Sequence, residues 1–241
     1  MESTSKEKKI NELPESFNNA KIIEVGKNFL NISVLTLFLF IVFTIFVSAG
    51  VFREFDIALT ANLQNIIPRV FDTPFSVFSI LGSFEITFIA FFILVLFLFR
   101  GREVVVFAVF FVLLGVTELF LKSQIPQIAP PIELLRTNIH LGFPSGALSG
   151  EHFAYPSGHL ARTVFISAVL IFAIFKSSLV LSLKQMLYTG IFLFIAIMFV
   201  SRIYLAEHWA TDVIGGTLLG LLIAIVGVYI LSKRNYKKLK T

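Results

Sequence analysis

The sequence of 241 residues contains no cysteine. This absence excludes disulfide bonds and every mechanism that needs a thiolate as nucleophile or metal ligand. Acidic residues are also few, and nowhere does the sequence group them in the manner of a carboxylate metal site. We therefore expect neither a metal nor another cofactor.

Charged residues of both signs are scarce, at 15% of the chain, whereas hydrophobic residues make up 56%. Leu, Ile, Val and Phe form runs of about 20 residues, the length that crosses the hydrocarbon core of a bilayer. A water-soluble protein of this size would need far more polar surface to cover its core. The composition therefore indicates an integral membrane protein.

The spacing of the apolar runs predicts an all-α bundle of about six transmembrane helices. The predicted spans are Phe29–Ala49, Phe75–Phe99 with a start near Phe78, Val104–Leu121, His159–Phe175, Leu183–Val200 and Val213–Leu231. The stretch Val51–Phe71 mixes charged and apolar residues, which favours a helix lying in the membrane interface. We expect one membrane domain at residues 29–232, between a cytoplasmic tail at 1–28 and a basic cytoplasmic tail at 233–241.

A long polar connection, Lys122–Pro156, joins the third and fourth predicted spans and carries five of the eight prolines. Connections of this length are usually functional or disordered. With six spans, the side that holds this connection has only six of the 20 lysines and arginines, namely Arg53, Arg69, Lys122, Arg136, Arg162 and Arg202. The positive-inside rule therefore predicts cytoplasmic termini and an outward-facing connection. Because the basic residues flank apolar spans, they indicate a membrane orientation and not a nucleic-acid partner.

The first stretch with candidate chemistry runs from Ser201 to Asp212, just before the last predicted span. His208 and Asp212 lie four residues apart, so on a helix they share a face and can hydrogen-bond. A carboxylate on one ring nitrogen fixes the imidazole tautomer and makes the other nitrogen more nucleophilic. Arg202 offers a planar fork of donors suited to phosphoryl oxygens. Each residue alone is more often a helix anchor or cap, but their clustering favours a functional site.

The second stretch is Pro156-Ser157-Gly158-His159, at the start of the fourth predicted span. The backbone N–H groups of Ser157 and Gly158 stand where a helix begins, which is a natural anion site, and glycine permits close approach. His159 is placed to give or take a proton. The alternative interpretation is a turn in which Ser157 caps the span. The same triplet at Pro144–Gly146 precedes neither a histidine nor a span, and we interpret it as a loop turn.

Together these residues resemble the type-two phosphatidic acid phosphatase superfamily, which also includes the vanadium haloperoxidases. That family carries three motifs in order: Lys, six residues, Arg-Pro; then Pro-Ser-Gly-His; then Ser-Arg, five residues, His, three residues, Asp. Pro156–His159 meet the second motif in full. The third is met in full by Ser201, Arg202, His208 and Asp212. The resemblance covers residues 122–231.

The first motif is met only in part. Lys122 and Pro130 stand at the expected distance, but Ala129 occupies the position of the arginine, which in the family helps to bind the phosphoryl group. The site must therefore either gain a compensating cation or bind the phosphoryl group weakly. Arg162 follows His159 by three residues and lies on nearly the same helix face, so it is our candidate. Arg136, in the long connection, is the alternative.

The resemblance implies a lipid phosphatase that needs no metal. In the implied mechanism, His208 attacks phosphorus to form a phosphohistidine, Asp212 orients it, and His159 protonates the leaving oxygen and then activates water. The phosphoryl oxygens are implied to lie against Lys122, Arg202 and the backbone of Ser157 and Gly158, with Arg162 added here in place of the missing arginine.

The substrate implied is a phosphorylated membrane lipid such as phosphatidic acid, phosphatidylglycerophosphate, a polyprenyl diphosphate or lipid A, whose chains stay in the bilayer. A phosphotransferase that uses the same residues, and a non-catalytic lipid-binding or transport relative, are the alternatives.

Overall fold

The computed structural model describes residues 15–139, 141–143 and 154–238. Within these ranges the chain forms helices and two 3-10 turns and contains no strand. In chain order the elements are α2 (Glu15–Ser48), α3 (Arg53–Ile66), η1 (Arg69–Phe71), α4 (Asp72–Ile80), α5 (Phe84–Leu98), α6 (Arg102–Gln124), η2 (Ile132–Leu134), α7 (Gly158–Lys176), α8 (Leu181–Tyr204) and α9 (Ala210–Lys238). The predicted turn at Pro144–Gly146 lies outside the described residues.

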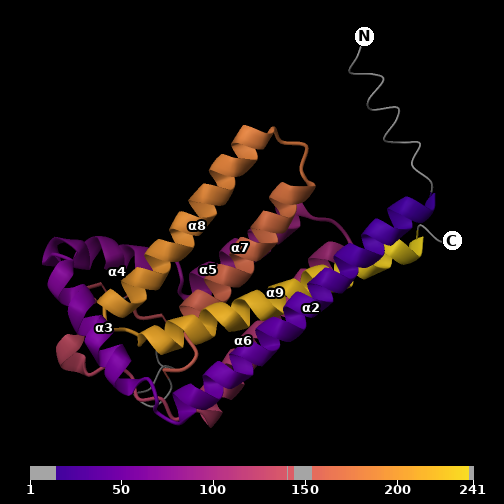
Figure 1. Ribbon diagram of the computed structural model, residues 1–241. Coiled ribbons are helices and arrows are strands. Elements are labelled where there is room, and N and C mark those ends of the chain that lie inside the picture. Colours follow the sequence, from indigo (N-terminus) through magenta and orange to yellow (C-terminus); the bar gives the residue numbers. More distant parts are fainter. Residues whose placement is uncertain (1–14, 140, 144–153, 239–241) are drawn as a thin grey trace.

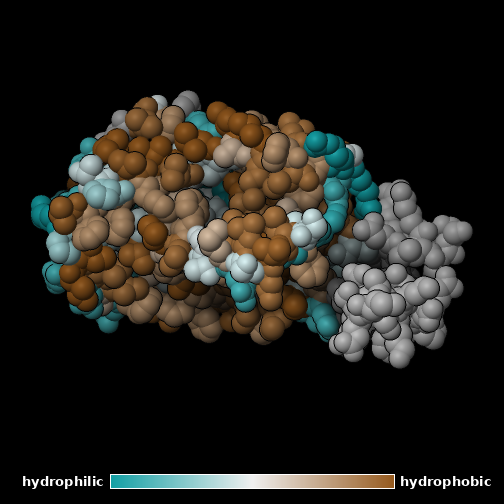
Figure 2. All heavy atoms as spheres, turned by 90° about the horizontal axis from the view of Figure 1, so that it is seen from above, coloured by the Kyte–Doolittle hydropathy of each residue, from teal (hydrophilic) through white to brown (hydrophobic). Residues whose placement is uncertain are grey.

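Within the described ranges, five helical segments are long and apolar enough to cross a membrane, namely Asn28–Ser48 of α2, all of α6, α7 and α8, and Ala210–Ser232 of α9. A sixth crossing is formed if Arg69–Ile80 and Phe84–Leu98, which meet at a bend of 52°, count as one span. Hydrophobic side chains cover most of the face seen in Figure 2. The predicted all-α membrane bundle is therefore confirmed.

The second predicted span differs from the single helix expected from near Phe78. The helix is interrupted between Ile80, where α4 ends, and Phe84, where α5 begins. Ser83 ends α4 locally, since its hydroxyl donates to the Ile80 carbonyl at 2.7 Å. Gly82 is packed so closely on α7 that a Cβ there would lie 2.7 Å from Cδ2 of His159. The break therefore makes room for a histidine that the sequence singled out.

Helices α7 and α9 lie side by side at the centre, and α2 runs along the other side of α9 (Figure 1). Gly216 and Gly220, one turn apart on α9, face α7, where a Cβ on either would collide with the backbone of Ser157 or Ala161. Small residues at this spacing let two membrane helices approach closely. The starts of α7 and α9, which carry the two complete motifs, are consequently held together.

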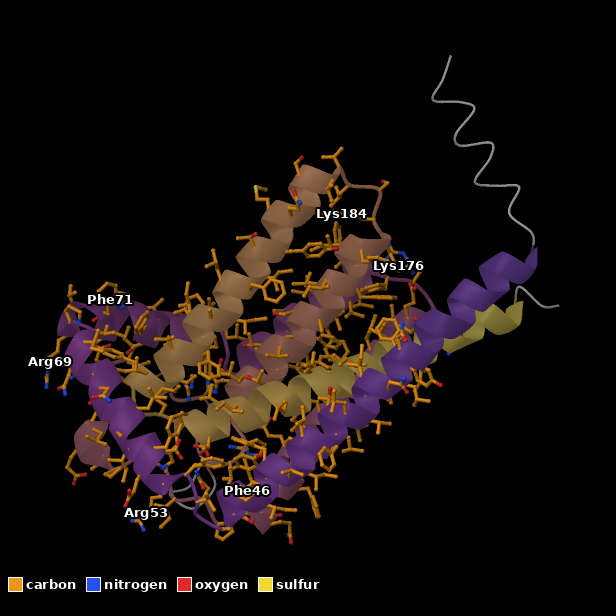
Figure 3. All side chains as sticks on the ribbon, viewed as in Figure 1. Phe46, Arg53, Arg69, Phe71, Lys176 and Lys184 are labelled. Carbon is orange, nitrogen blue, oxygen red and sulfur yellow. The ribbon has the colours of Figure 1, made fainter. Side chains whose placement is uncertain are left out.

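The two ends of the bundle carry different cations. Arg53 and Arg69 lie at the end where α3 and α4 pack, and Lys176 and Lys184 lie at the opposite end (Figure 3). Helix α7 runs from Gly158 at the first end to Lys176 at the second, so the motif residues belong to the end of Arg53 and Arg69. All of the candidate chemistry thus lies at one end of the bundle.

Candidate active site

The His208–Asp212 contact expected from the sequence is present. Oδ2 of Asp212 lies 3.3 Å from Nδ1 of His208 and also accepts the backbone N–H of Trp209 at 2.9 Å. The carboxylate therefore holds the imidazole through Nδ1, and Nε2 is the ring nitrogen that does not contact Asp212. Burial, together with the nearby positive charges of Arg202, Lys122 and Arg162, holds the pKa of His208 well below its usual range. The ring is therefore neutral near pH 7, the form in which a ring nitrogen can attack.

The Pro-Ser-Gly-His stretch meets the start of α9 through its backbone. The N–H of Ser157 donates to the Asp212 carbonyl at 2.9 Å, so it does not stand unpaired as the sequence predicted. The Ser157 hydroxyl, by contrast, is fully buried and has no partner among the described residues. The N–H of Gly158 lies in the first turn of α7, where backbone donors lack intrahelical acceptors.

A side chain at position 158 would displace the buried ion pair of Glu118 and Arg162. A Cβ there would overlap the carboxylate of Glu118 and lie 2.7 Å from Nη1 of Arg162. The next residue, His159, is half-buried and packs against Gly82 from the break between α4 and α5. The start of α7 is therefore enclosed by α5 and α6 as well as α9.

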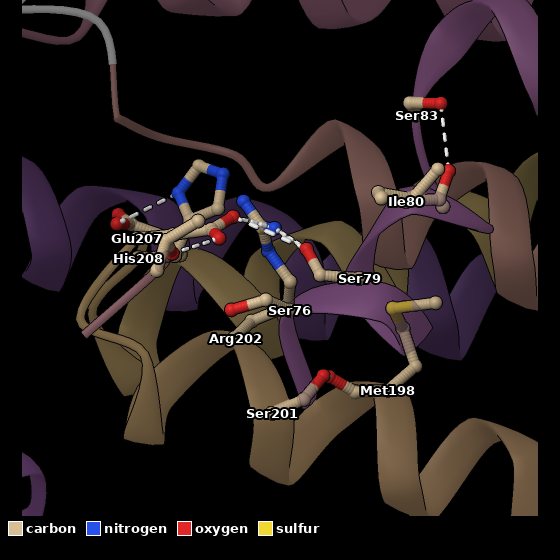
Figure 4. Close-up of polar contacts among 12 residues, drawn as sticks. Ser76, Ser79, Ile80, Ser83, Met198, Ser201, Arg202, Glu207 and His208 are labelled. Carbon is tan, nitrogen blue, oxygen red and sulfur yellow. Dashed lines mark hydrogen bonds and ion pairs between the residues drawn. The ribbon is translucent and has the colours of Figure 1, made fainter. Parts of the chain in front are cut away.

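Arg202, in the last turn of α8, is buried with 4% of its side chain exposed. Its Nη1 donates to the Ser79 hydroxyl of α4 and pairs with the carboxylate of Glu207 (Figure 4). Glu207 also accepts from the hydroxyl of Thr137 in the connection that follows α6. The Nε of Arg202 has no partner within the described part of the chain. One donor of the guanidinium thus stays available inside the site.

Lys122 and Arg162 both face the buried carboxylate of Glu118, a residue that no sequence motif singled out. Nη1 of Arg162 lies 2.6 Å from Oε2 of Glu118, and Nζ of Lys122 lies 4.0 Å from Oε1. Arg162 also donates to the Gly82 carbonyl at 3.4 Å. Arg162 therefore lies next to Gly158, as its helix face predicted, but its charge is paired with Glu118.

Arg136 lies in a different environment. Its guanidinium donates to the Tyr204 hydroxyl at 2.9 Å and to the Gln64 carbonyl at 3.0 Å, and it stacks over the Tyr204 ring. Its backbone N–H donates to the Leu205 carbonyl. Arg136 thus fastens the connection to α3 and α8. Of the two candidates for the missing charge, the structure brings Arg162 to the Pro-Ser-Gly-His motif.

The segment that contains Ala129 is also fixed beside the start of α9. The indole N–H of Trp209 donates to the Ile128 carbonyl at 2.7 Å, and the Gln127 amide donates to the Thr211 hydroxyl at 3.1 Å. Ala129 follows directly, so the position of the family arginine lies close to His208 in the fold. The segment that corresponds to the first motif therefore lies beside the start of α9, even though its arginine is missing.

Asp56 of α3 is a second residue that no sequence motif singled out, and it contacts the start of α9. Its buried carboxylate accepts the backbone N–H of Thr211 at 2.9 Å and the Thr211 hydroxyl at 2.6 Å. Burial raises the pKa of Asp56 above its ordinary value, against the opposing effect of these hydrogen bonds. An acceptor at a helix N-terminus satisfies donors that the helix cannot. Helix α3 therefore fixes the turn that presents His208.

Among the described residues, no three His, Asp or Glu side chains lie together as metal ligands would. The groups that do converge beside the neutral His208 are Lys122, Arg162 and Arg202, the first turn of α7, and buried donors that find no partner in the described part of the chain. Such a set fits an anion, and a phosphoryl group in particular.

A membrane bundle with this site has the features of a membrane phosphatase. The PAP2 superfamily matches residues 104–236, more than half of the chain, and the chain belongs to that superfamily. The protein is therefore an integral membrane enzyme of the phosphoric ester hydrolase class. No curated protein sequence matches the chain.

Two crystal structures are similar to this fold. One is a transmembrane PAP2 type phosphatidylglycerolphosphate phosphatase from Bacillus subtilis, with a TM-score of 0.65 and 22% identity over 86% of this chain and 96% of that one. The other is Aquifex aeolicus LpxE, with a TM-score of 0.53 and 26% identity over 71% of this chain and 93% of that one. Both are similar over nearly their whole length, so the bundle described here corresponds to their complete fold.

Proposed function

We propose that the protein removes a phosphate group from a phosphorylated membrane lipid through a phosphohistidine on His208. The observation that carries the proposal is the neutral imidazole of His208, held by Asp212, together with the buried Arg202 and a Ser157 hydroxyl that has no partner among the described residues. Nucleophile, orienting carboxylate and anion donors are thus together, as covalent phosphoryl transfer requires.

In the first step, Nε2 of His208 attacks phosphorus and the bond from phosphorus to the lipid oxygen breaks. His159 gives its proton to that oxygen, so a lipid alcohol leaves, or a lipid monophosphate if the substrate is a diphosphate. Lys122, Arg202, the Ser157 hydroxyl and the Gly158 N–H stabilise the charge that develops on the phosphoryl oxygens. Arg162 adds to this field from beside Gly158, in place of the arginine absent at Ala129.

In the second step, His159 takes a proton from water and the water oxygen attacks phosphorus. The bond between phosphorus and Nε2 breaks, phosphate leaves, and His208 is restored. The position of His159 at the start of α7, half-buried against Gly82, is compatible with both proton transfers.

The proposal is tested with purified His208→Ala, Asp212→Asn and wild-type protein on a panel of phosphatidic acid, phosphatidylglycerophosphate, a polyprenyl diphosphate and lipid A. His208→Ala is expected to abolish phosphate release, and Asp212→Asn to lower turnover by roughly 10³- to 10⁴-fold, as loss of an orienting carboxylate does elsewhere. His140→Ala, a histidine outside the motifs, is the matched control and keeps activity. A folded His208→Ala protein that releases phosphate at the wild-type rate rules out the mechanism.

The intermediate has its own test. Wild-type protein quenched with base during turnover of phosphorus-labelled substrate should carry an acid-labile, base-stable label. That label should be absent from His208→Ala. A wild-type protein that turns over without ever carrying the label refutes the phosphohistidine but leaves the phosphatase assignment standing.

We further propose that the site faces outward and that both termini are cytoplasmic, on the strength of the uneven distribution of lysine and arginine. Because the chain has no cysteine, single cysteines report topology directly. Glu133→Cys, in η2 near the site, should react with an impermeant thiol reagent in intact cells. Ser178→Cys, between α7 and α8 at the opposite end, should not. The reverse pattern would invert the proposed orientation.

A further inference from the structure

Glu207 is a charged residue of the site to which neither the three motifs nor the two steps above give a role. Its carboxylate pairs with Arg202 and lies 3.3 Å from the Ser79 hydroxyl (Figure 4). It also accepts from the Thr137 hydroxyl. Its side chain is 17% exposed, compared with 4% for Arg202. The carboxylate thus lies on the more exposed side of the arginine, immediately before His208 in the chain.

Arg202 is also the guanidinium that the proposed mechanism uses to hold a phosphoryl group. Its Nε and the Ser157 hydroxyl are buried, and neither has a partner in the part of the chain that the structure describes. A phosphoryl oxygen that reached these donors would share one guanidinium with the carboxylate of Glu207. Two anions so close together in a largely buried site repel each other strongly.

The side chains of Arg202 and Glu207 are held differently, and this difference decides which of the two moves. Arg202 has a second partner, the Ser79 hydroxyl of α4, which it can keep when Glu207 moves away. Glu207 has a second partner, Thr137, in the connection after α6, and part of its side chain reaches solvent. The carboxylate can therefore leave Arg202 without losing every partner or entering an apolar environment.

We propose that Glu207 competes with the phosphoryl group for Arg202 and so sets the affinity of the site for phosphate. In the free enzyme the Glu207 carboxylate neutralises Arg202. Substrate displaces this carboxylate from Arg202, and it returns as inorganic phosphate leaves. This inference rests on the proposed function, because it takes Arg202 as the phosphoryl ligand. Its consequence is an enzyme that binds phosphate weakly and resists inhibition by its own product.

The test is the inhibition constant of inorganic phosphate for purified Glu207→Gln, measured against hydrolysis of a lipid phosphate. Glutamine keeps the size of glutamate and one acceptor oxygen but removes the competing charge. The inhibition constant is expected to fall about tenfold, the size of effect typical for a close charge in a partly buried site, with KM falling in the same direction. An inhibition constant that is unchanged or higher overturns the inference.

Two controls separate competition from a structural role. Glu133→Gln removes one exposed negative charge from the same end of the bundle and should leave the inhibition constant unchanged. Thr137→Val removes the contact with the connection but keeps the carboxylate, so it should not lower the inhibition constant. If Thr137→Val lowers it as much as Glu207→Gln does, the tether and not the charge sets phosphate affinity, and the inference fails.

Arg202→Ala distinguishes this inference from the function on which it rests. If Arg202→Ala changes neither turnover nor phosphate inhibition, the proposed function itself is wrong. If Arg202→Ala weakens phosphate binding while Glu207→Gln does not strengthen it, only the inference fails. Should Glu207→Gln not fold, Glu207→Asp retracts the charge from Arg202 by one methylene group, and the inhibition constant should again fall.

Discussion

Replacing Glu118 with glutamine is expected to destabilise the protein more than any change to its two cationic partners. Glu118 lies inside α6 with 9% of its side chain exposed, 2.6 Å from Arg162 and 4.0 Å from Lys122. At an effective dielectric constant of about 20, these separations correspond to attractions of about 6 and about 4 kcal/mol before desolvation is subtracted. Glu118→Gln removes both attractions and leaves two like charges beside each other.

The net cost follows from measured buried pairs, for which removal of one partner destabilises by about 3–5 kcal/mol. For a domain of this size that corresponds to a fall in melting temperature of roughly 6–20 °C. Arg162→Met should cost less, because Glu118 keeps Lys122 as a partner. The double variant Glu118→Leu with Arg162→Met should recover much of the loss, since buried pairs are often replaced by apolar side chains at little cost.

Thermal unfolding of the purified proteins in one detergent, followed by circular dichroism, measures these differences. Glu103→Gln is the matched control, because Glu103 pairs with Lys176 at the exposed end of the bundle and such pairs contribute little. A melting temperature of Glu118→Gln equal to that of the wild type would refute the reasoning from the buried pair.

Activity of the same double variant shows what Arg162 does. If Arg162 supplies the charge missing at Ala129, the double variant should be stable but about a hundredfold lower in kcat/KM, as for other lost transition-state contacts. A double variant that is both stable and fully active would show that Arg162 serves only to hold Glu118.

Three further predictions concern the surroundings of the site. Gly158→Ala should abolish activity and lower the melting temperature, because its Cβ would overlap Glu118, whereas Gly115→Ala, with nothing within 4 Å, should be tolerated. Ala129→Arg should lower the inhibition constant of phosphate by adding a cation beside the start of α9; an unchanged constant contradicts the placement of the first motif. Burial raises the pKa of Asp56, so the folded protein binds a proton on this carboxylate more tightly than the unfolded chain does. The contribution of Asp56 to stability therefore falls as pH rises above its ordinary pKa. Asp56→Asn should therefore flatten the decline of melting temperature from about pH 4 upward, and a steeper decline would contradict this.

The parts of the fold that were predictable from the sequence depend on local patterns. Apolar runs mark the spans, and the His208–Asp212 contact follows from a spacing of four residues. The contacts that the sequence did not reveal join distant residues, such as Asp56 and Thr211, which lie 155 positions apart. The break at Gly82 belongs to the same group, since its reason is a histidine on α7.

Some missed residues did carry a usable signal. Glu118 is a lone carboxylate within an apolar span, four residues before Lys122, and ionisable residues in such spans are functional candidates by default. Gly216 and Gly220 have the spacing of a close helix contact. Glu207 carried no such signal, because an acidic residue in a short polar turn is ordinary, and only its contact with Arg202 distinguishes it.

The broken second span also leads to an expectation for the lipid around the protein. Helix α5 has 15 residues, which at 1.5 Å per residue give a length of about 22 Å, short of the roughly 30 Å of a bilayer's hydrocarbon core. The missing length is at the N-terminal end of α5, which lies beside His159 and where the helix axis bends by 52° relative to Arg69–Ile80. Bilayers adapt to a short span by thinning. We therefore expect a thinner leaflet next to Gly82, in which a lipid headgroup would lie near the depth of His159 with its acyl chains still in the membrane.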